Sequence, residues 1–309
     1  MPHSNQCSRW VAVARKPVLR TLTMKPEHRL ANLGSWNERV PIHLESDLYD
    51  VDGFLAGKSK LRPFELQEIG DVVGRRLAHL QCHIGLDTLS WARQGALVTG
   101  LDFSPAAIDA ARDLARKAGI EAKFVVGDVL ESAALLEDSF DIVYTGLGAL
   151  CWIDDLECWS RQVADLLKPG GVLYLVEFHP LTDIFSENTL QVTDSYFDGG
   201  RAYRDDTPGT YADPNAVTSH NVNYSWTHPV SSVITRLLTA GFSLDLFTEH
   251  DFTLFPRFEG LVNGHEDVHR FPEGHPRLPL MYSLRATRTA PVPPPEPHLD
   301  PAHDPEARP

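Results

Sequence analysis

A turn of mixed side chains between two apolar runs is the stretch of this chain most able to do chemistry. The first run, over 77–80, stops at the sequence Gln-Cys-His-Ile-Gly (81–85), and a second run, over 96–101, ends on Asp102. Between them, Leu86, Leu89 and Trp91 have helical spacing, and Gly95 is placed to end that helix. The pattern predicts strand, tight turn, helix, strand and acid. In doubly wound folds this unit binds a nucleotide-like ligand, and the acid accepts hydrogen bonds from ribose hydroxyls.

The turn departs from the usual dinucleotide pattern, Gly-x-Gly-x-x-Gly. Gln81 and His83 stand at the first two glycine positions, and the one glycine within the turn is Gly85, where the backbone can approach a ligand closely. The two side chains either donate hydrogen bonds to the ligand or point away and leave only backbone contacts. Cys82 and His83 are adjacent, which makes them poor partners for one ion, and no other pair has ligand spacing. The sequence therefore predicts no metal site.

Four further segments follow the turn in a fixed order. They are Gly-Leu-Asp-Phe-Ser-Pro (100–105), Phe-Val-Val-Gly-Asp-Val (124–129), Phe-Asp-Ile-Val-Tyr (140–144) and Leu-Leu-Lys-Pro-Gly-Gly-Val-Leu-Tyr (166–174). Together with the turn, they resemble the class I S-adenosylmethionine (SAM) dependent methyltransferases over residues 36 to 286. The variant His-Leu-Gln-Cys-His at 79–83 is similar to that of a subgroup of bacterial small-molecule enzymes.

The resemblance implies SAM as the cofactor and assigns roles to individual residues. Asp102 would accept the ribose hydroxyls, since Ser104 already fills the alternative role of helix cap. Asp128 would contact the adenine amine, although it could also be a plain turn residue after Gly127. Gln81 or His83 would donate to the methionine carboxylate. The predicted cofactor-binding set is Gln81, Cys82, His83, Gly85, Asp102, Phe103, Ser104, Gly127, Asp128, Val129 and Thr145.

Methyl transfer from a sulfonium needs little catalytic machinery. The protein must align a nucleophile behind the methyl carbon, exclude water and, where needed, accept a proton. His179 follows Glu177 at the end of the predicted fifth strand, where it could act as the base with Glu177 orienting its ring. Its alternative is a turn histidine before Pro180. Tyr49, in the N-terminal segment, is the third catalytic candidate.

Large aromatic residues outside the nucleotide unit are the candidates for an acceptor pocket. Trp36, Trp152, Tyr224 and Trp226 could wall such a pocket, or be ordinary core residues. Aromatic walls favour flat or cationic ligands through stacking and cation–π contact. We therefore expect transfer to an oxygen, nitrogen or activated carbon of a small aromatic or heteroaromatic metabolite, in specialised metabolism.

The alternation of strand and helix patterns predicts an α/β fold with a parallel sheet. The resemblance implies a Rossmann-like, doubly wound, seven-stranded sheet whose last strand, over 280–286, is antiparallel. We expect a disordered leader (1–24), an N-terminal helical lid segment (25–70), the methyltransferase domain (71–290) and a disordered tail (291–309). Clustered turn residues such as Asp198-Gly199-Gly200 predict a β-rich flap inserted at 181–229.

Composition narrows the class of partner. The 309 residues hold 42 acids against 28 bases, a net charge of −14, which argues against nucleic acid as main partner. Four cysteines are too few for a disulfide framework, and no apolar run is long enough for a bilayer. We expect a cytoplasmic protein with a small-molecule partner and no membrane partner. The oligomeric state is left open.

Three other functions fit parts of the pattern. A nicotinamide-dependent oxidoreductase would share the fold, but the missing glycines and the Lys-Pro-Gly-Gly turn count against it. A non-catalytic SAM-binding protein is suggested by the replaced glycines, while the retained Asp102 and Asp128 indicate that a ligand still binds. A methyltransferase of macromolecules is the third.

Overall fold

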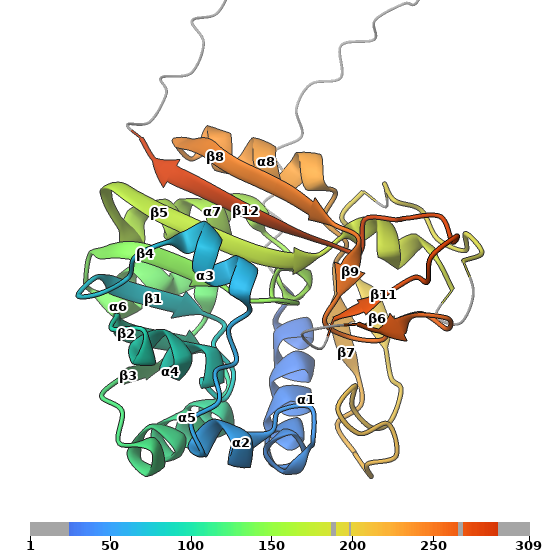
Figure 1. Cartoon of the computed structure of the whole chain (residues 1–309), viewed down its shortest axis with the longest axis horizontal. Coiled ribbons are helices and arrows are strands. Elements are labelled where there is room, and N and C mark those ends of the chain that lie inside the picture. The colour runs from blue at the N-terminus through green and yellow to red at the C-terminus, as the bar shows by residue number, and fades with distance from the viewer. Residues whose placement is uncertain (1–24, 187–189, 198, 265–267, 290–309) are drawn as a thin grey trace, which may run out of the picture.

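A computed structural model of the protein describes residues 25–186, 190–197, 199–264 and 268–289. The expected leader and tail lie outside these residues. One seven-stranded sheet has the order β3-β2-β1-β4-β5-β12-β8 (Figure 1). Its strands are β1 (Arg76–Leu80), β2 (Leu97–Asp102), β3 (Lys123–Val126), β4 (Phe140–Thr145), β5 (Leu167–Phe178), β8 (Phe242–His250) and β12 (Met281–Arg288). Strands β1 to β5 pair in parallel, and β12 is antiparallel to both β5 and β8. The predicted sheet and its antiparallel last strand are confirmed.

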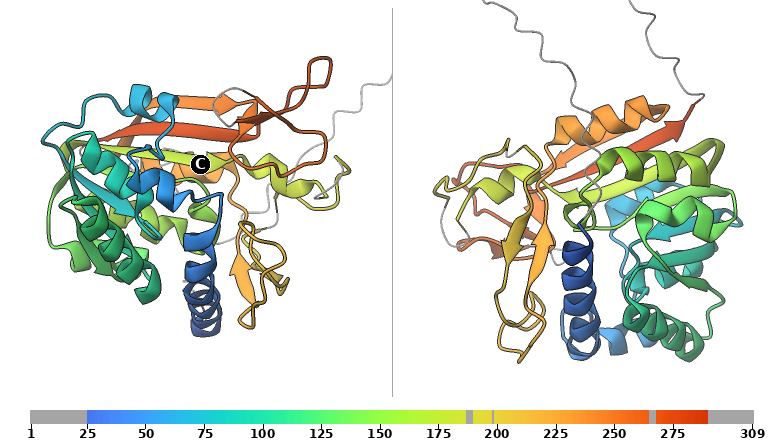
Figure 2. Two further views of the ribbon diagram at one scale, coloured as in Figure 1. Left: turned by 60° about the horizontal axis from the view of Figure 1, so that its bottom comes forward. Right: turned by 180° about the vertical axis from the view of Figure 1, so that it is seen from behind.

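Helices cover both faces of the sheet (Figure 2). One face carries α3 (Pro63–Ile69), α4 (Leu86–Arg93) and α5 (Pro105–Ala118); the other carries α6 (Ser132–Leu136), α7 (Leu156–Leu166) and α8 (Val230–Thr239). Local sequence fixes α5: the Ser104 side chain accepts from the N–H of Ala107, Pro105 opens the helix, and left-handed Gly119 ends it. The predicted helix between the second and third strands is confirmed.

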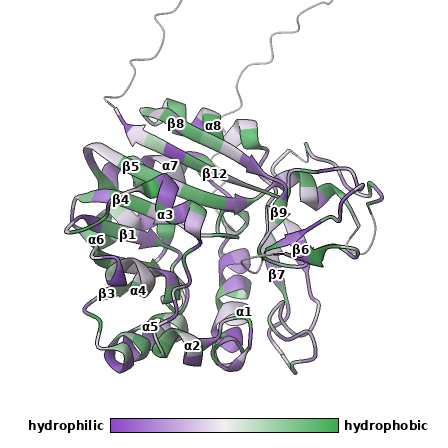
Figure 3. Ribbon diagram, in the orientation of Figure 1, coloured by the Kyte–Doolittle hydropathy of each residue, from purple (hydrophilic) through white to green (hydrophobic). Residues whose placement is uncertain are grey.

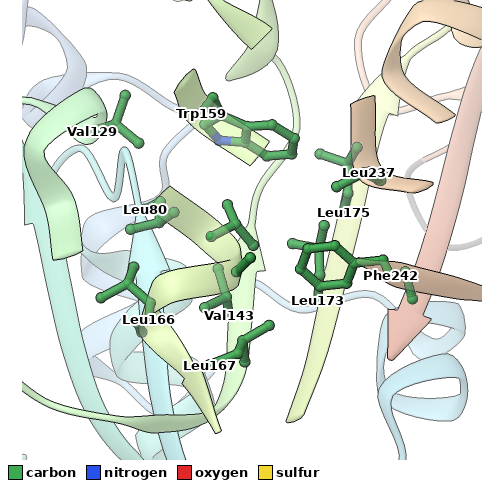
Figure 4. Close-up of a cluster of buried hydrophobic side chains, with 14 of the residues drawn as sticks. Leu80, Val129, Val143, Trp159, Leu166, Leu167, Leu173, Leu175, Leu237 and Phe242 are labelled. Carbon is green, nitrogen blue, oxygen red and sulfur yellow. The ribbon is translucent and has the colours of Figure 1, made fainter. Parts of the chain in front are cut away.

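The core lies between the sheet and its helices. The central strands are largely hydrophobic in Figure 3. On the α7 and α8 side, the strand residues Leu80, Val143 and Leu173 pack with Trp159 and Leu237 (Figure 4), and all five are at most 1% exposed. Burying each such side chain contributes about 1.5–3 kcal/mol. The sheet is therefore a firm platform for the residues at its strand ends.

The N-terminal segment forms α1 (Pro26–Glu45), α2 (Val51–Leu55) and α3. Helix α1 stands between α5 and strand β7 (Figures 1 and 2), and it contacts both. The predicted helical segment is therefore present, and it lies between the nucleotide unit and the insertion.

Two small sheets extend the domain. The predicted flap contains a hairpin of β6 (Tyr203–Asp205) and β7 (Asn223–Ser225). A second sheet, with the order β10-β11-β9, was not predicted: β9 (Phe252–Thr253), β10 (Val262–Asn263) and β11 (His269–Arg270). Two-residue strands are too short to show an alternating pattern. Within the part of the chain that the structure describes, no helix is both long and apolar enough to cross a bilayer.

Candidate active site

The carboxyl ends of β1, β2 and β4 meet at one edge of the sheet. Leu80 pairs with Leu101 on one side and with Thr145 on the other, so the turn at 81–85, Asp102 and the loop after β4 lie close together. A cavity opens at this edge. It is lined by Arg29, Asn32, Gln81, Leu101, Asp102, Phe103, Gly127, Asp128, Val129, Leu130, Trp152 and Ile153. Six of the predicted cofactor residues are in this set.

The turn after β1 has a left-handed backbone at three positions, and only one of the three is a glycine. Gln81 and His83 have φ of 57° and 49°, and Gly85 has φ of 78°. A non-glycine residue in this left-handed region is uncommon and costs on the order of 1–3 kcal/mol. Such strain is typical of functional sites, and here two polar side chains occupy the strained positions.

Gly85 lies in a tightly packed position. A Cβ atom there would lie 2.8 Å from a ring carbon of Phe124 and 2.9 Å from the Cβ of Ala111. This glycine lets the start of α4 pack against α5 and β3, and it does not line the cavity. Cys82 is likewise buried and outside the lining, and burial raises the pKa of its thiol.

Asp102 is 7% exposed at the end of β2. One carboxylate oxygen accepts from the backbone N–H of His83 (2.8 Å) and the other from that of Ser104 (2.9 Å). Burial raises the pKa of Asp102 to about 6, against the effect of these N–H donors. The carboxylate is therefore ionised at neutral pH. Since each carboxylate oxygen can accept more than one hydrogen bond, acceptor capacity is left for a hydroxyl donor.

Several buried polar atoms around this edge have no partner among the described residues. The Gln81 amide donates to the carbonyl of Ala149 (2.9 Å), but its Oε1 atom is unpaired. The Nδ1 atom of His83 and the hydroxyl of Thr145 are also unpaired. Leaving such atoms buried and unbonded costs about 1–3 kcal/mol each. They fit a polar ligand that offers both donors and acceptors, as a nucleoside joined to an amino acid does.

Helix α1 closes the cavity from outside. The Asp128 carboxylate accepts from the N–H of Leu130 (2.9 Å) and forms an ion pair with the Nε atom of Arg29 on α1 (3.0 Å). The cavity holds only about 40 Å³, whereas ligand pockets usually hold about 300–1,000 Å³. A nucleoside-sized ligand can enter only if α1 or its neighbours move.

Ser104 helps to dock α1. Its hydroxyl accepts from the N–H of Ala107 and donates to the side chain of Asn37 on α1 (2.6 Å). This residue therefore caps α5 and links it to α1.

An aromatic cluster lies where α1, the turn, the loop after β4 and the flap meet. Trp36 contacts Trp152 and His83 edge-on, with ring centroids 5.2 and 5.3 Å apart, and Tyr49 stacks on His43 at 4.9 Å. The hydroxyls of Tyr49 and Tyr211 are hydrogen-bonded. We call Trp36, His43, Tyr49, His83, Trp152 and Tyr211 the aromatic cluster.

Two members of the aromatic cluster were missed as site residues. Tyr211 is an aromatic residue of the flap segment, so its residue type was a signal in the sequence. His43 carries no local sequence signal, because only folding brings it to His83 (Nδ1 to Nε2, 3.0 Å).

The other two predicted pocket residues hold the flap on the first half of α1. Tyr224 stacks on His28 at 3.9 Å, and its backbone N–H and carbonyl bond the side chain of Asn32 (2.7 and 2.9 Å). Trp226 also lies near His28, at 5.9 Å, and is 5% exposed. Neither belongs to the aromatic cluster.

The structure does not bring His179 to the cavity. Its Nε2 atom bonds Glu249 (3.0 Å), and its Nδ1 atom accepts from the N–H of Leu181 (3.1 Å), so both ring nitrogens have partners. Glu177 is buried and accepts from the N–H groups of Gly148 and Leu150 (2.7 and 2.8 Å). It shapes the loop after β4 instead of orienting the His179 ring.

Part of the chain is similar in sequence to known methyltransferases. Residues 78–171, from β1 into β5, match the family described as "Methyltransferase domain". Over 130 residues the chain is 34% identical to the ubiquinone biosynthesis O-methyltransferase of Xanthomonas euvesicatoria, covering 41% of this chain and 54% of the relative. The chain thus spans about half the length of the curated relatives it matches.

Solved structures extend the likeness beyond the methyltransferase segment. The CcbJ methyltransferase from Streptomyces caelestis has a TM-score of 0.56 and 14% identity, covering 83% of this chain and 98% of that one. A protein from Listeria monocytogenes described as a SAM-dependent methyltransferase has a TM-score of 0.51 and 19% identity, covering 73% of this chain and 97% of that one. At these identities the likeness shows the fold, which confirms the predicted Rossmann-like architecture.

Proposed function

We propose that this protein is a SAM-dependent methyltransferase that acts on a small molecule. The observation that carries the proposal is the buried Asp102 carboxylate at the same sheet edge as the Gln81 Oε1 and His83 Nδ1 atoms, which have no hydrogen-bond partner among the described residues. A carboxylate with free acceptor capacity suits the ribose hydroxyls, and the two unpaired atoms suit the amino acid end of the cofactor. The match of residues 78–171 to the methyltransferase domain family supports the same assignment.

The remaining cofactor contacts come from the cavity lining. Phe103, Val129 and Trp152 offer apolar surface for the adenine ring, and Asp128 can accept from its amine, since its carboxylate holds more hydrogen bonds than its two present partners use. Helix α1 acts as the lid: Arg29 releases Asp128 when the site opens and pairs with it again when the site closes.

The aromatic cluster forms the acceptor side. Its rings offer flat faces next to the turn, so a small aromatic or heteroaromatic acceptor is the best match. Oxygen is the first nucleophile to test, because the similar Xanthomonas protein is named an O-methyltransferase; nitrogen and activated carbon follow.

Bound SAM supplies a methyl group made electrophilic by the sulfonium. The chain's own residues align the acceptor and exclude water, which are the main requirements of such a transfer. Desolvation raises the pKa of Tyr49 and brings that of Tyr211 to about 12, so both hydroxyls stay protonated. Since one of the two hydroxyls donates to the other, one proton of the pair is left to donate to the acceptor. Tyr49 is therefore a positioning residue, and Glu177 acts indirectly by holding the loop that carries Trp152.

The test is transfer of a labelled methyl group from SAM to a panel of aromatic phenols, amines and heteroaromatic acceptors. We expect turnover by the wild type and a loss of at least 100-fold in Asp102→Asn. Asp109→Asn, which changes an exposed carboxylate on α5, is the matched control and should retain full activity. Cofactor binding without transfer to any acceptor would instead favour a non-catalytic SAM-binding protein.

A further inference from the structure

A row of hydrogen bonds runs from the flap into the cofactor turn. The hydroxyl of Thr210 lies 3.1 Å from the Nε2 atom of His43, and the Nδ1 atom of His43 lies 3.0 Å from the Nε2 atom of His83. Thr210 and His43 are buried, with relative exposures of 7% and 0%. Each ring nitrogen in the row is either a donor or an acceptor, so fixing one proton fixes the others.

The Thr210 hydroxyl fixes the first proton. Its oxygen accepts from the N–H of Ala212 at 2.9 Å and, more distantly, from the N–H of Asp213 at 3.3 Å. The N–H of Asp213 also donates to the carbonyl of Thr210 at 3.1 Å. A hydroxyl has two lone pairs and one proton. Since N–H groups take the lone pairs, the proton is left to donate to the Nε2 atom of His43.

The proton positions then follow along the row. Burial lowers the pKa of His43 to about 4 and that of His83 to about 3, so each ring is neutral and carries one proton at pH 7. His43 accepts at Nε2 and therefore donates from Nδ1. His83 accepts that bond at Nε2, and its proton must be on Nδ1, the buried atom that has no partner among the described residues.

We propose that Thr210 and His43 hold His83 as an Nδ1–H donor for the carboxylate at the amino acid end of the cofactor. The opposite tautomer would present a lone pair to that anion. The backbone N–H of the same His83 bonds Asp102, the proposed ribose acceptor, so the donor lies next to the ribose site. Thr210 is then a positioning residue on the flap that acts on cofactor binding through two rings. The identity of the ligand rests on the proposed function; the proton order does not.

Ring nitrogen chemical shifts test the proton order without any ligand. The full chain is labelled with nitrogen-15 histidine, and His43→Asn and His83→Asn variants assign the two rings. We expect a protonated Nδ1 and a bare Nε2 on both rings in the wild type and in Thr210→Ser. Thr210→Val, which removes the hydroxyl but keeps the shape, should mix the two forms. A protonated Nε2 on either wild-type ring, or unchanged shifts in Thr210→Val, would overturn the proposal.

Calorimetric titration tests whether His83 binds the carboxylate at the amino acid end of the cofactor. S-adenosylhomocysteine should bind about ten- to a hundredfold more weakly to Thr210→Val than to Thr210→Ser, the loss expected for one hydrogen bond to a charged group. Methylthioadenosine, which lacks the amino acid, should bind both variants equally. Equal weakening of both ligands would point to a structural effect and reject the carboxylate assignment. If the wild type binds neither ligand, the proposed function fails, while the shifts still decide the proton order.

Discussion

Replacing Gln81 tests whether a residue with a side chain is strained at this left-handed position of the turn. We compare Gln81→Gly with Gln81→Ala. Both variants lose the bond to the Ala149 carbonyl, about 1 kcal/mol, so this loss cancels between them. At φ of 57° the alanine variant keeps the left-handed strain of about 1–2 kcal/mol, which glycine does not suffer. The glycine variant loses about 0.5–1 kcal/mol of folding stability, because glycine gives the unfolded chain more conformational entropy.

The difference predicts that Gln81→Gly is more stable than Gln81→Ala by about 0.5–1 kcal/mol. The measurement is the free energy of unfolding from urea titration. The matched control is Thr235, an exposed position inside α8, where glycine should be less stable than alanine by about 1 kcal/mol. Equal ordering at the two positions would refute the claim of strain.

The same pair tests the function of the side chain. If the Oε1 atom of Gln81, which has no partner among the described residues, contacts the cofactor, both variants should bind S-adenosylhomocysteine about tenfold more weakly than the wild type, even though glycine restores the first glycine position of the usual pattern. Binding of Gln81→Gly at wild-type strength would show that the side chain has no role in the ligand site.

Three further changes probe the supports of the site. Burial and nearby Asp87 raise the pKa of Glu65 to about 7, so the folded state holds the Glu65 proton more tightly than the unfolded state does, and wild-type stability falls as pH rises from about 4.5 to 7. In urea titrations across this pH range, the stability of Glu65→Gln should fall by up to about 3 kcal/mol less than that of the wild type. Parallel plots of stability against pH for the two proteins would contradict this. Glu177→Gln should lower the free energy of unfolding by about 2–3 kcal/mol, because an amide cannot accept all the N–H donors of the loop; an unchanged urea midpoint would disprove this. Burial opposes ionisation of Glu38, but donors from Ser219 and His220 hold its pKa at about 2; Glu38→Gln should therefore speed amide hydrogen exchange in the 210–225 segment, with exchange in β4 as the internal control that stays constant.

The sheet and the residues at its carboxyl edge could be predicted because their signals are local. Apolar runs ending in Asp102 and Asp128, and glycines closing helices, are readable over a few neighbouring residues. The positions of Asp102 and Gln81 in the cavity lining follow from these signals.

The aromatic cluster could not be predicted from local sequence patterns. The aromatic cluster joins residues as far apart as Trp36 and Tyr211, and no pattern within either segment says that they meet. His179 shows the opposite case: the rule that strand ends carry catalytic residues drew attention to it, but strand β8 supplies Glu249 as a partner that the sequence does not reveal. Tertiary pairing decided both outcomes.

The most direct test of the whole account is calorimetric titration of the wild-type protein with S-adenosylhomocysteine, beside Asp102→Asn and Asp109→Asn. The account predicts one site per chain, micromolar binding in the wild type and in Asp109→Asn, and a loss of at least 100-fold in Asp102→Asn. Absence of binding in the wild type, or equal binding by all three proteins, would contradict the claim that the edge formed by Gln81, His83 and Asp102 is a SAM site.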